Sequence, residues 1–206
     1  MTNGTQRRGV VDIEGVVLDA ALTCSHQLGF SKVTIDDICR ESGVSRASVY
    51  RLFPGGRDVL FEALRVRELH QFFDHVLAEI ADQTTVDAIV VGSVVAATSL
   101  LQADEHLAMM LSSEPGEALG QLTAAGLPRI IRMATEALDP QLEPLIGRDA
   151  AHRLIDLVVR LTVSHFLSPV EAVDLNDVES AQQFLCPLIS SVTSYQQQLN
   201  SVTTLS

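Results

Sequence analysis

The fold of this 206-residue chain is decided by Thr34–Phe53, which reads TIDDICRESGVSRASVYRLF. Thr34 is a good helix N-cap residue, and Asp37 follows three positions later, as in a capping box. Gly43 stands where the end of a helix needs a positive φ, and Ser45 is placed to cap a second helix directly afterwards. The stretch therefore predicts two short helices joined by a tight turn, which is a helix-turn-helix.

The second of these helices turns most of its polar side chains outward. If Val44 and Val49 face inward, the outward positions are Arg46, Ala47, Ser48, Tyr50 and Arg51. Arg, Ser and Tyr supply hydrogen-bond donors for phosphates and base edges, and the positive end of the helix dipole favours phosphate. The pattern alone fits a DNA-reading helix, and it also fits an ordinary small helical hairpin.

The rest of the chain is predicted to be helical, with short breaks between the helices. Gly29 is expected to stop the first helix, and Gly126–Pro128 to notch a later one. Pro187 is expected to kink or split the last helix after Cys186. The expected helices cover roughly 10–28, 57–81, 85–102, 104–113, 117–138, 149–167 and 177–199. The fold class predicted is all-α.

Charge is divided unequally along the sequence, whose net charge is −12. Residues 1–67 hold nine Lys/Arg and eight Asp/Glu, whereas residues 68–206 hold five and eighteen. Such an asymmetry indicates two domains, and the strongly acidic part would repel phosphate. Only the N-terminal part is therefore expected to face a nucleic acid.

Composition also favours a cytoplasmic protein with no membrane partner. The longest apolar run, residues 88–101, is shorter than the roughly 18 residues that a spanning helix needs, so a buried helix is expected. The first twenty residues include Asp12, Glu14 and Asp19 and lack the uninterrupted apolar core of a signal peptide. The three cysteines are scattered, which predicts reduced thiols packed as small apolar groups.

Several segments together closely resemble the N-terminal domain of regulators of the TetR (tetracycline-repressor) family. The segments are Leu18–Ala21, Gly29–Phe30, Thr34–Ile38, Gly43–Ser45, Ser48–Tyr50 and Phe53–Pro54. The resemblance covers roughly residues 12–65, and the remainder matches only in outline. It implies a three-helix DNA-binding domain over residues 1–56. It also implies a larger helical domain over residues 57–206 for effector binding and dimerisation.

The same resemblance implies roles for individual residues in DNA binding. Thr34 caps its helix and contacts phosphate, Ser48 and Tyr50 reach the DNA backbone, and Arg46 and Ala47 read bases. Where the family commonly has a phosphate-binding lysine, this sequence has Gly55-Gly56-Arg57, one residue longer, so Arg57 is the expected substitute. The complete expected set is Thr34, Ser45, Arg46, Ala47, Ser48, Tyr50, Arg51 and Arg57. Arg7 and Arg8 form either an additional DNA-contacting arm or a solvated tail.

Two chains are expected to associate through their last two helices, which carry apolar stripes at helix-packing spacing. A two-fold homodimer would offer its recognition helices to successive major grooves, about 34–36 Å apart, on a near-palindromic double-stranded operator. The residues expected at this interface are Leu154, Val158, Leu161, Leu185, Leu188, Val192 and Tyr195.

The larger domain is expected to bind a small hydrophobic effector. Residues 86–138 are rich in Val, Leu, Ile and Met and contain no Phe, Tyr or Trp. An aliphatic or acyl ligand suits such a wall better than a flat aromatic one, which needs a π face for stacking. The expected pocket residues are Val94, Met109, Met110, Leu127, Arg129, Ile131, Met133, Leu161, His165 and Phe166. The alternative is that the aliphatic groups are ordinary core and that Arg129 and Arg132 are both solvated.

These observations predict a DNA-binding transcription regulator, a repressor by default, whose affinity for DNA the effector modulates. A constitutive DNA-binding protein without an effector and an activator are the alternatives. No nucleophile elbow, P-loop or dinucleotide fingerprint is present in the sequence, so an enzyme is not expected. His70 and Asp74 are read as part of a polar helix face, so no metal or other cofactor is expected.

Overall fold

A computed structural model describes residues 12–113, 115–123 and 126–203 of the chain. These residues form helices joined by turns and loops, with no strand among them, so the predicted all-α class is confirmed. They divide into two compact units, Met1–Arg67 and Glu68–Ser206. The division falls inside α4 (Arg57–Glu79), whereas the sequence suggested a boundary just before that helix.

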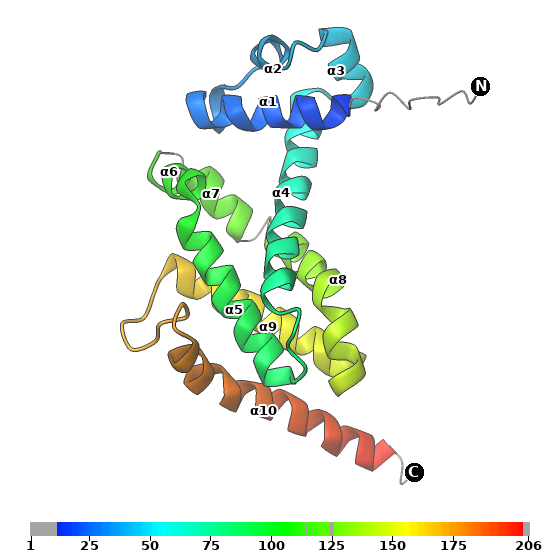
Figure 1. The fold of residues 1–206 in the computed structure, drawn as a ribbon, viewed down its shortest axis with the longest axis vertical. Helices are drawn as coiled ribbons and strands as arrows, with labels where there is room; N and C mark the ends of the chain where they lie inside the picture. The colour runs from blue at the N-terminus through cyan, green and yellow to red at the C-terminus, as the bar shows by residue number, and fades with distance from the viewer. Residues whose placement is uncertain (1–11, 114, 124–125, 204–206) are drawn as a thin grey trace, which may run out of the picture. The chain divides into compact units, whose positions relative to one another are not determined.

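The first unit has its own hydrophobic core, which explains where the division falls. It contains α1 (Ile13–Leu28), η1 (Phe30–Lys32), α2 (Ile35–Ser42), α3 (Arg46–Leu52) and the first turns of α4 (Figure 1). Leu60, Phe61 and Leu64 of α4 are buried in this core together with residues of α1, α2 and α3. The start of α4 is thus an integral part of the helix-turn-helix unit.

Position 25 in α1 places a hydroxyl inside this core. Ser25 is fully buried, and its hydroxyl donates to the carbonyl of Leu22 at 2.7 Å. A buried hydroxyl costs little when it is paired with a carbonyl acceptor.

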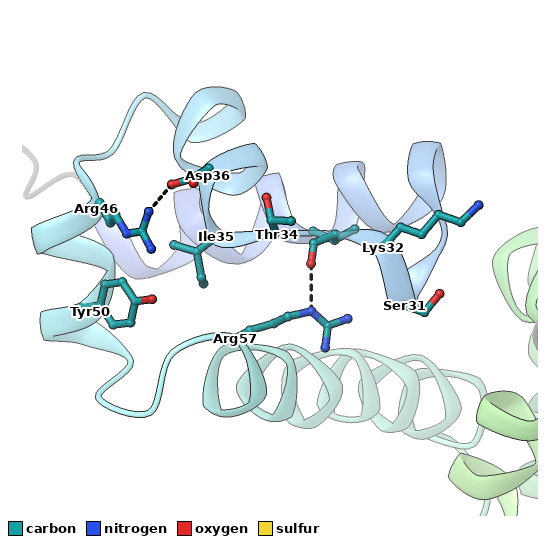
Figure 2. Close-up of a pocket in the computed structure, with 9 residues that line it drawn as sticks. Ser31, Lys32, Thr34, Ile35, Asp36, Arg46, Tyr50 and Arg57 are labelled. Carbon is teal, nitrogen blue, oxygen red and sulfur yellow. Dashed lines mark hydrogen bonds and ion pairs between the residues drawn. The ribbon is translucent and has the colours of Figure 1, made fainter.

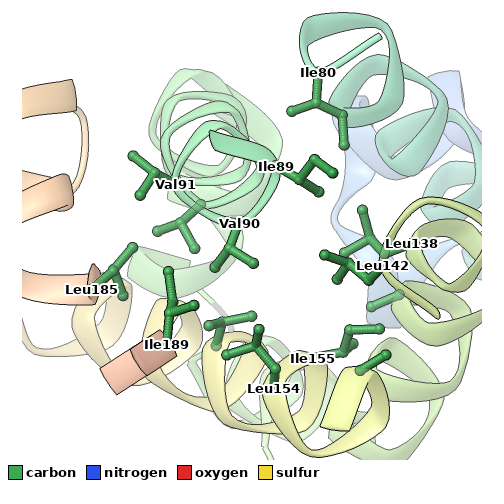
Figure 3. Close-up of a cluster of buried hydrophobic side chains, with 14 of the residues drawn as sticks. Ile80, Ile89, Val90, Val91, Leu138, Leu142, Leu154, Ile155, Leu185 and Ile189 are labelled. Carbon is green, nitrogen blue, oxygen red and sulfur yellow. The ribbon is translucent and has the colours of Figure 1, made fainter. Parts of the chain in front are cut away.

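The second unit is built from six further helices and the remainder of α4. They are α5 (Val86–Ala103), α6 (Glu105–Ser113), α7 (Pro115–Leu122), α8 (Leu127–Ile146), α9 (Arg148–Leu167) and α10 (Val178–Thr203). α8 packs along α9, and α10 lies against α5 and α9. Figure 3 shows how side chains of these helices meet in one cluster, with Ile89 and Val90 facing Leu142, Leu154 and Ile155.

This cluster corrects part of the predicted dimer interface. Leu154 and Leu185 are fully buried within a single chain, and Val158 is only 5% exposed. Their apolar stripes pack against helices of the same chain, so these three side chains are not available to a second one. Leu161, Leu188 and Val192 are half-buried. Tyr195 lies on α10, and its side chain is outside the described part of the chain.

Prolines inside two helices do not end them. α8 continues through Pro140 and Pro144 to Ile146, beyond its expected end near residue 138, and α10 runs unbroken through Pro187. All three prolines are exposed. The carbonyls that lose a helical hydrogen bond can therefore turn to water, which lowers the cost of an interior proline.

α5 has the length and apolar composition of a membrane-spanning helix, the only such helix among the described residues. A core helix passes the same test, and Ile89, Val90, Val91 and Val94 of α5 belong to the buried cluster. The hydroxyls of its buried Ser93 and Thr98 donate to carbonyls of the same helix, each at 2.7 Å. These features are those of the buried helix predicted from the sequence.

Candidate nucleic-acid interface

The predicted capping box at the start of α2 is present. The amide of Asp37 donates to Thr34 Oγ1 at 3.2 Å, and the amide of Thr34 donates to Asp37 Oδ2 at 3.0 Å. The Thr34 hydroxyl also donates to Asp37 Oδ2, at 2.6 Å. These hydrogen bonds from Thr34, the side-chain one foremost, lower the pKa of the Asp37 carboxyl. The cap fixes the position of Thr34 at the protein surface.

The turn between α2 and α3 also forms as predicted. Gly43 has φ of 68°, and its amide donates to the carbonyl of Cys39 at 3.0 Å. The amide of Ser48 then donates to the side chain of Ser45 at 3.3 Å, which caps α3. Since a positive φ is costly for residues with a Cβ, glycine at this turn sets the direction in which α3 leaves.

α3 presents the side chains expected to face DNA. Val49 is fully buried and anchors the helix to the core of the first unit. On the other side, Arg46, Ala47, Tyr50 and Arg51 are exposed. The capping residues Thr34 and Ser45 are exposed as well, and Ser48 is half-buried.

An open hollow of about 440 Å³ lies between η1, α2, α3 and the start of α4. Its lining combines cations with groups able to donate hydrogen bonds, as Figure 2 shows. The lining residues are Ser31, Lys32, Val33, Thr34, Ile35, Asp36, Arg46, Tyr50 and Arg57. The helix-turn-helix fold thus brings Thr34, Arg46, Tyr50 and Arg57 of the predicted set together at one surface.

Arg46 is held by two neighbours at the edge of this hollow. Its NH1 donates to Asp36 Oδ1 at 2.8 Å, and its guanidinium carbon lies 5.6 Å from the centre of the Tyr50 ring (Figure 2). A hydrogen bond to Tyr50 and the charge of Asp36 raise the pKa of the guanidinium. Asp36 therefore occupies a donor of Arg46, a residue predicted to read bases.

Arg57 makes contacts within its own unit that the sequence did not predict. Its Nε donates to the carbonyl of Val33 at 2.8 Å, and its NH2 donates to the carbonyl of Phe30. Its guanidinium carbon also lies 4.7 Å from the centre of the Phe61 ring, a cation–π distance. Two donors of Arg57 are thus used to fasten the start of α4 to η1, which the expectation of a free phosphate contact did not include.

Gly56, directly before α4, allows a close approach to Tyr50 of α3. Gly56 has φ of 71°, and a Cβ added there would lie 3.2 Å from a ring carbon of Tyr50. A larger residue at position 56 would be strained in its backbone and would press on the ring. Glycine at position 56 therefore helps to place Tyr50 beside the hollow.

Lys32 lines the hollow but was absent from the expected set. It is exposed, and Figure 2 shows its amine extending outward from the end of η1. A signal for it was present in the sequence, because Lys32 is the only lysine of the chain. Asp36, also missed, is recognisable only once α2 and α3 are placed side by side.

The residues expected to line an effector pocket lie in the second unit, in differing environments. Val94, Met110 and Met133 are buried, and Val94 and Met133 belong to the continuous core. Met109 is exposed, at 37%. The others are half-buried, namely Leu127, Arg129, Ile131, Leu161, His165 and Phe166.

Comparison with known sequences assigns the first unit to a family. Residues 17–64 match the family model of bacterial regulatory proteins of the tetR family. This range includes α2, the turn, α3 and the start of α4. The first unit is a TetR-family N-terminal domain. Within the matched range, α3 stands where the family has its recognition helix, and the hollow lies beside α3.

Similar sequences include HTH-type transcriptional regulators of Mycobacterium tuberculosis strain H37Rv and of Mycobacterium bovis. Each is 30% identical to this chain over 103 residues. The match covers 50% of this chain and 52% of each relative, so it spans about half the length of these proteins.

Solved structures show the same fold over most of the chain. The TetR family repressor AlkX from Dietzia sp. superposes with a TM-score of 0.64, over 86% of this chain and 98% of AlkX. The repressor QsdR of R. erythropolis gives a TM-score of 0.57, over 88% and 94%. The identities are 21% and 15%, so what these structures establish is the shared helical fold.

Proposed function

We propose that this TetR-family chain is a cytoplasmic transcription regulator, a repressor by default, that binds double-stranded DNA through α3. The observation that carries the proposal is the exposed α3, with Arg46 and Tyr50 beside a hollow that Thr34 also lines. Hydroxyl, phenol and guanidinium donors at one surface match the phosphate and base-edge acceptors of a duplex. The acidic remainder of the sequence favours an approach with this surface first.

Binding as a homodimer to a near-palindromic operator is part of the proposal. α10 keeps an apolar surface that the protomer does not cover, since Phe184 is 37% exposed and Leu188 and Val192 are half-buried. These residues stand at intervals of four, so they follow one side of the helix. Leu161 of α9 is half-buried too, and the proposed interface consists of these four side chains.

The proposal is tested by footprinting the purified protein on the DNA upstream of its own coding sequence. We expect a protected, near-palindromic site, and binding that weakens steeply as salt is raised because phosphate contacts release counterions. A protein that protects no site and binds duplex DNA without salt dependence would contradict DNA-directed regulation. Reporter expression with the mapped site then distinguishes a repressor from an activator.

We also propose that the second unit binds a small aliphatic effector that modulates DNA binding. Support comes from the walls of the expected pocket, where half-buried Leu127, Ile131 and Leu161 are all aliphatic. The AlkX repressor is described as implicated in biodegradation of n-alkanes. That description belongs to AlkX, and here it suggests only that long-chain alkanes join fatty acids and acyl thioesters among the first compounds to test.

A thermal-shift and operator-release screen tests the effector. Aliphatic compounds are compared with planar aromatic cations, and a true effector raises the melting temperature in a titratable way. The alternative, constitutive DNA binding, is favoured by the inclusion of Val94 and Met133 in a continuous core. Release by aromatic compounds alone would exclude the aliphatic effector, and silence from both sets would favour the constitutive alternative.

A further inference from the structure

We propose that Lys32 is the phosphate-binding cation of this interface and that Arg57 has given up that role for a structural one. The inference rests on the proposed DNA binding and names one of its contacts. It assigns to Lys32 in η1, the short turn before α2, the phosphate contact that was predicted for Arg57 at the start of α4.

Arg57 is fixed in place by contacts within its own unit. Its two hydrogen bonds reach carbonyls on Phe30 and Val33, residues on either side of Lys32. Its guanidinium also stacks near Phe61, and its side chain is 33% exposed. Turning Arg57 toward a phosphate would break these bonds and leave two carbonyls without their donor, which is costly where they are partly buried.

The same contacts place Lys32 correctly. Because Arg57 holds the backbone on both sides of it, η1 is fastened to α4 and the lysine projects from a fixed base. Figure 2 shows the Lys32 amine on the outer side of this segment, away from Arg57. One arginine thus supports the backbone from beneath while the lysine extends into solvent.

The carboxylates that follow Lys32 most closely in the sequence already have partners. Asp36 binds Arg46 at 2.8 Å, and Asp37 binds Thr34 and Arg40. Among the described residues, Lys32 forms no ion pair. Its positive charge is therefore available to a ligand, and it stands two residues before Thr34, whose hydroxyl lies at the start of α2.

A lysine suits a backbone phosphate better than a base edge. Its ammonium is a compact charge on a flexible stem, and it binds phosphate as a point charge without the fixed bidentate geometry of arginine. The site therefore adds affinity and register without reading sequence. This division leaves base reading to α3.

The first test compares Lys32→Gln with Lys32→Arg in the full-length protein. Operator affinity is measured against salt concentration, with Arg132→Gln, which removes one exposed positive charge from the second unit, as the matched control. We expect Lys32→Gln to weaken binding to operator and non-operator duplexes alike and to lower the salt slope by about one unit. Lys32→Arg should keep the parental slope.

Two results would overturn the assignment while leaving the proposed function intact. One is a Lys32→Gln variant that binds with the slope of Arg132→Gln. The other is an Arg57→Gln variant that keeps the parental melting temperature but loses one unit of slope. A parent protein whose DNA binding is independent of salt would instead overturn the proposed function together with this inference.

A second readout uses the fact that Lys32 is the only lysine of the chain. Acetylation with an amine-directed reagent labels this side chain and the terminal amine, and peptide mass spectrometry measures the two separately. We expect operator DNA to slow labelling at Lys32 several-fold relative to the terminal amine. Labelling of Lys32 at an unchanged rate in the DNA complex would contradict the phosphate contact.

Discussion

The carboxylate of Asp36 in α2 lies 2.8 Å from the guanidinium of Arg46, the first residue of α3. Both side chains are largely exposed, at 62% and 59%. An ion pair in this setting contributes little to stability because water screens it. It does, however, place a negative charge where a DNA phosphate would otherwise meet Arg46.

We expect Asp36→Asn to strengthen binding to all duplexes and to steepen its salt dependence, because Arg46 is released for phosphate. The melting temperature should stay close to that of the parent. The measurement is a salt titration of operator and random DNA, repeated in an Arg46→Ala background. If Asp36→Asn has the same effect without Arg46, the carboxylate acts by general repulsion and the pairing has no role.

Two glycines with positive φ allow the effect of backbone strain to be separated from the effect of a contact with Tyr50. A Cβ at Gly43 would have open space, whereas a Cβ at Gly56 would lie 3.2 Å from the Tyr50 ring. Each glycine-to-alanine change should destabilise the protein by about 1–2 kcal/mol through backbone strain. Only Gly56→Ala should also displace Tyr50 and weaken operator binding at temperatures where both variants are folded. Equal losses of DNA affinity in the two variants would show that Gly56 has no special relation to Tyr50.

The capping box makes stability depend on pH in a predictable range. The pKa of Asp37 in the folded protein is lowered from its ordinary value of 3.8, which is the value expected in the unfolded chain. The carboxylate therefore contributes its full stabilisation of the folded state above that ordinary value. The contribution is lost as pH falls through the folded pKa. Urea unfolding between pH 5 and about pH 2 should therefore show a smaller acid-induced loss for Asp37→Asn than for the parent. Parallel curves would mean that Asp37 has the same pKa in both states.

Neighbouring positions on α10 should respond to charge in different ways. Phe184 is 37% exposed, whereas Leu185 is fully buried within the protomer. Phe184→Asp should give folded monomers that bind the operator weakly, and Leu185→Asp should unfold the protein because a buried unpaired charge is costly. Gln182→Asp, at an exposed polar position, is the control and should remain dimeric. Light scattering measures the oligomeric state and circular dichroism measures the folding of each variant. A Phe184→Asp variant that remains dimeric would place the interface elsewhere.

Local rules predicted the helix-turn-helix well, and this success has a physical cause. The Thr34–Asp37 box, the left-handed Gly43 and the Ser45 cap each depend on residues within four positions, so the sequence contains all the information that they need. The ends of α8 and α10 were harder to predict. The exposure of Pro140, Pro144 and Pro187 depends on the tertiary fold, and that exposure is what makes them tolerable.

Periodicity identified apolar stripes on α9 and α10 but not the surfaces they pack against. Leu154 and Leu185 stand at the predicted spacing, yet their partners are helices of the same chain. The hydrogen bonds of Arg57 could not be predicted for a similar reason, since its acceptors lie 24 and 27 residues away in the sequence. Local patterns indicate which side of a helix is apolar, and only the fold decides what covers it.

The two hydrophobic clusters of this protein share no buried residue. A substitution in one cluster therefore alters packing on that side and leaves the other set of side chains with its own neighbours, so the energetic effects of changes in the two clusters should add. Selection can then adjust the unit proposed to recognise DNA and the other unit at different rates. If the proposed functions hold, this independence gives the protein a simple route to a new effector or a new operator, because one unit can change while the other is inherited unchanged.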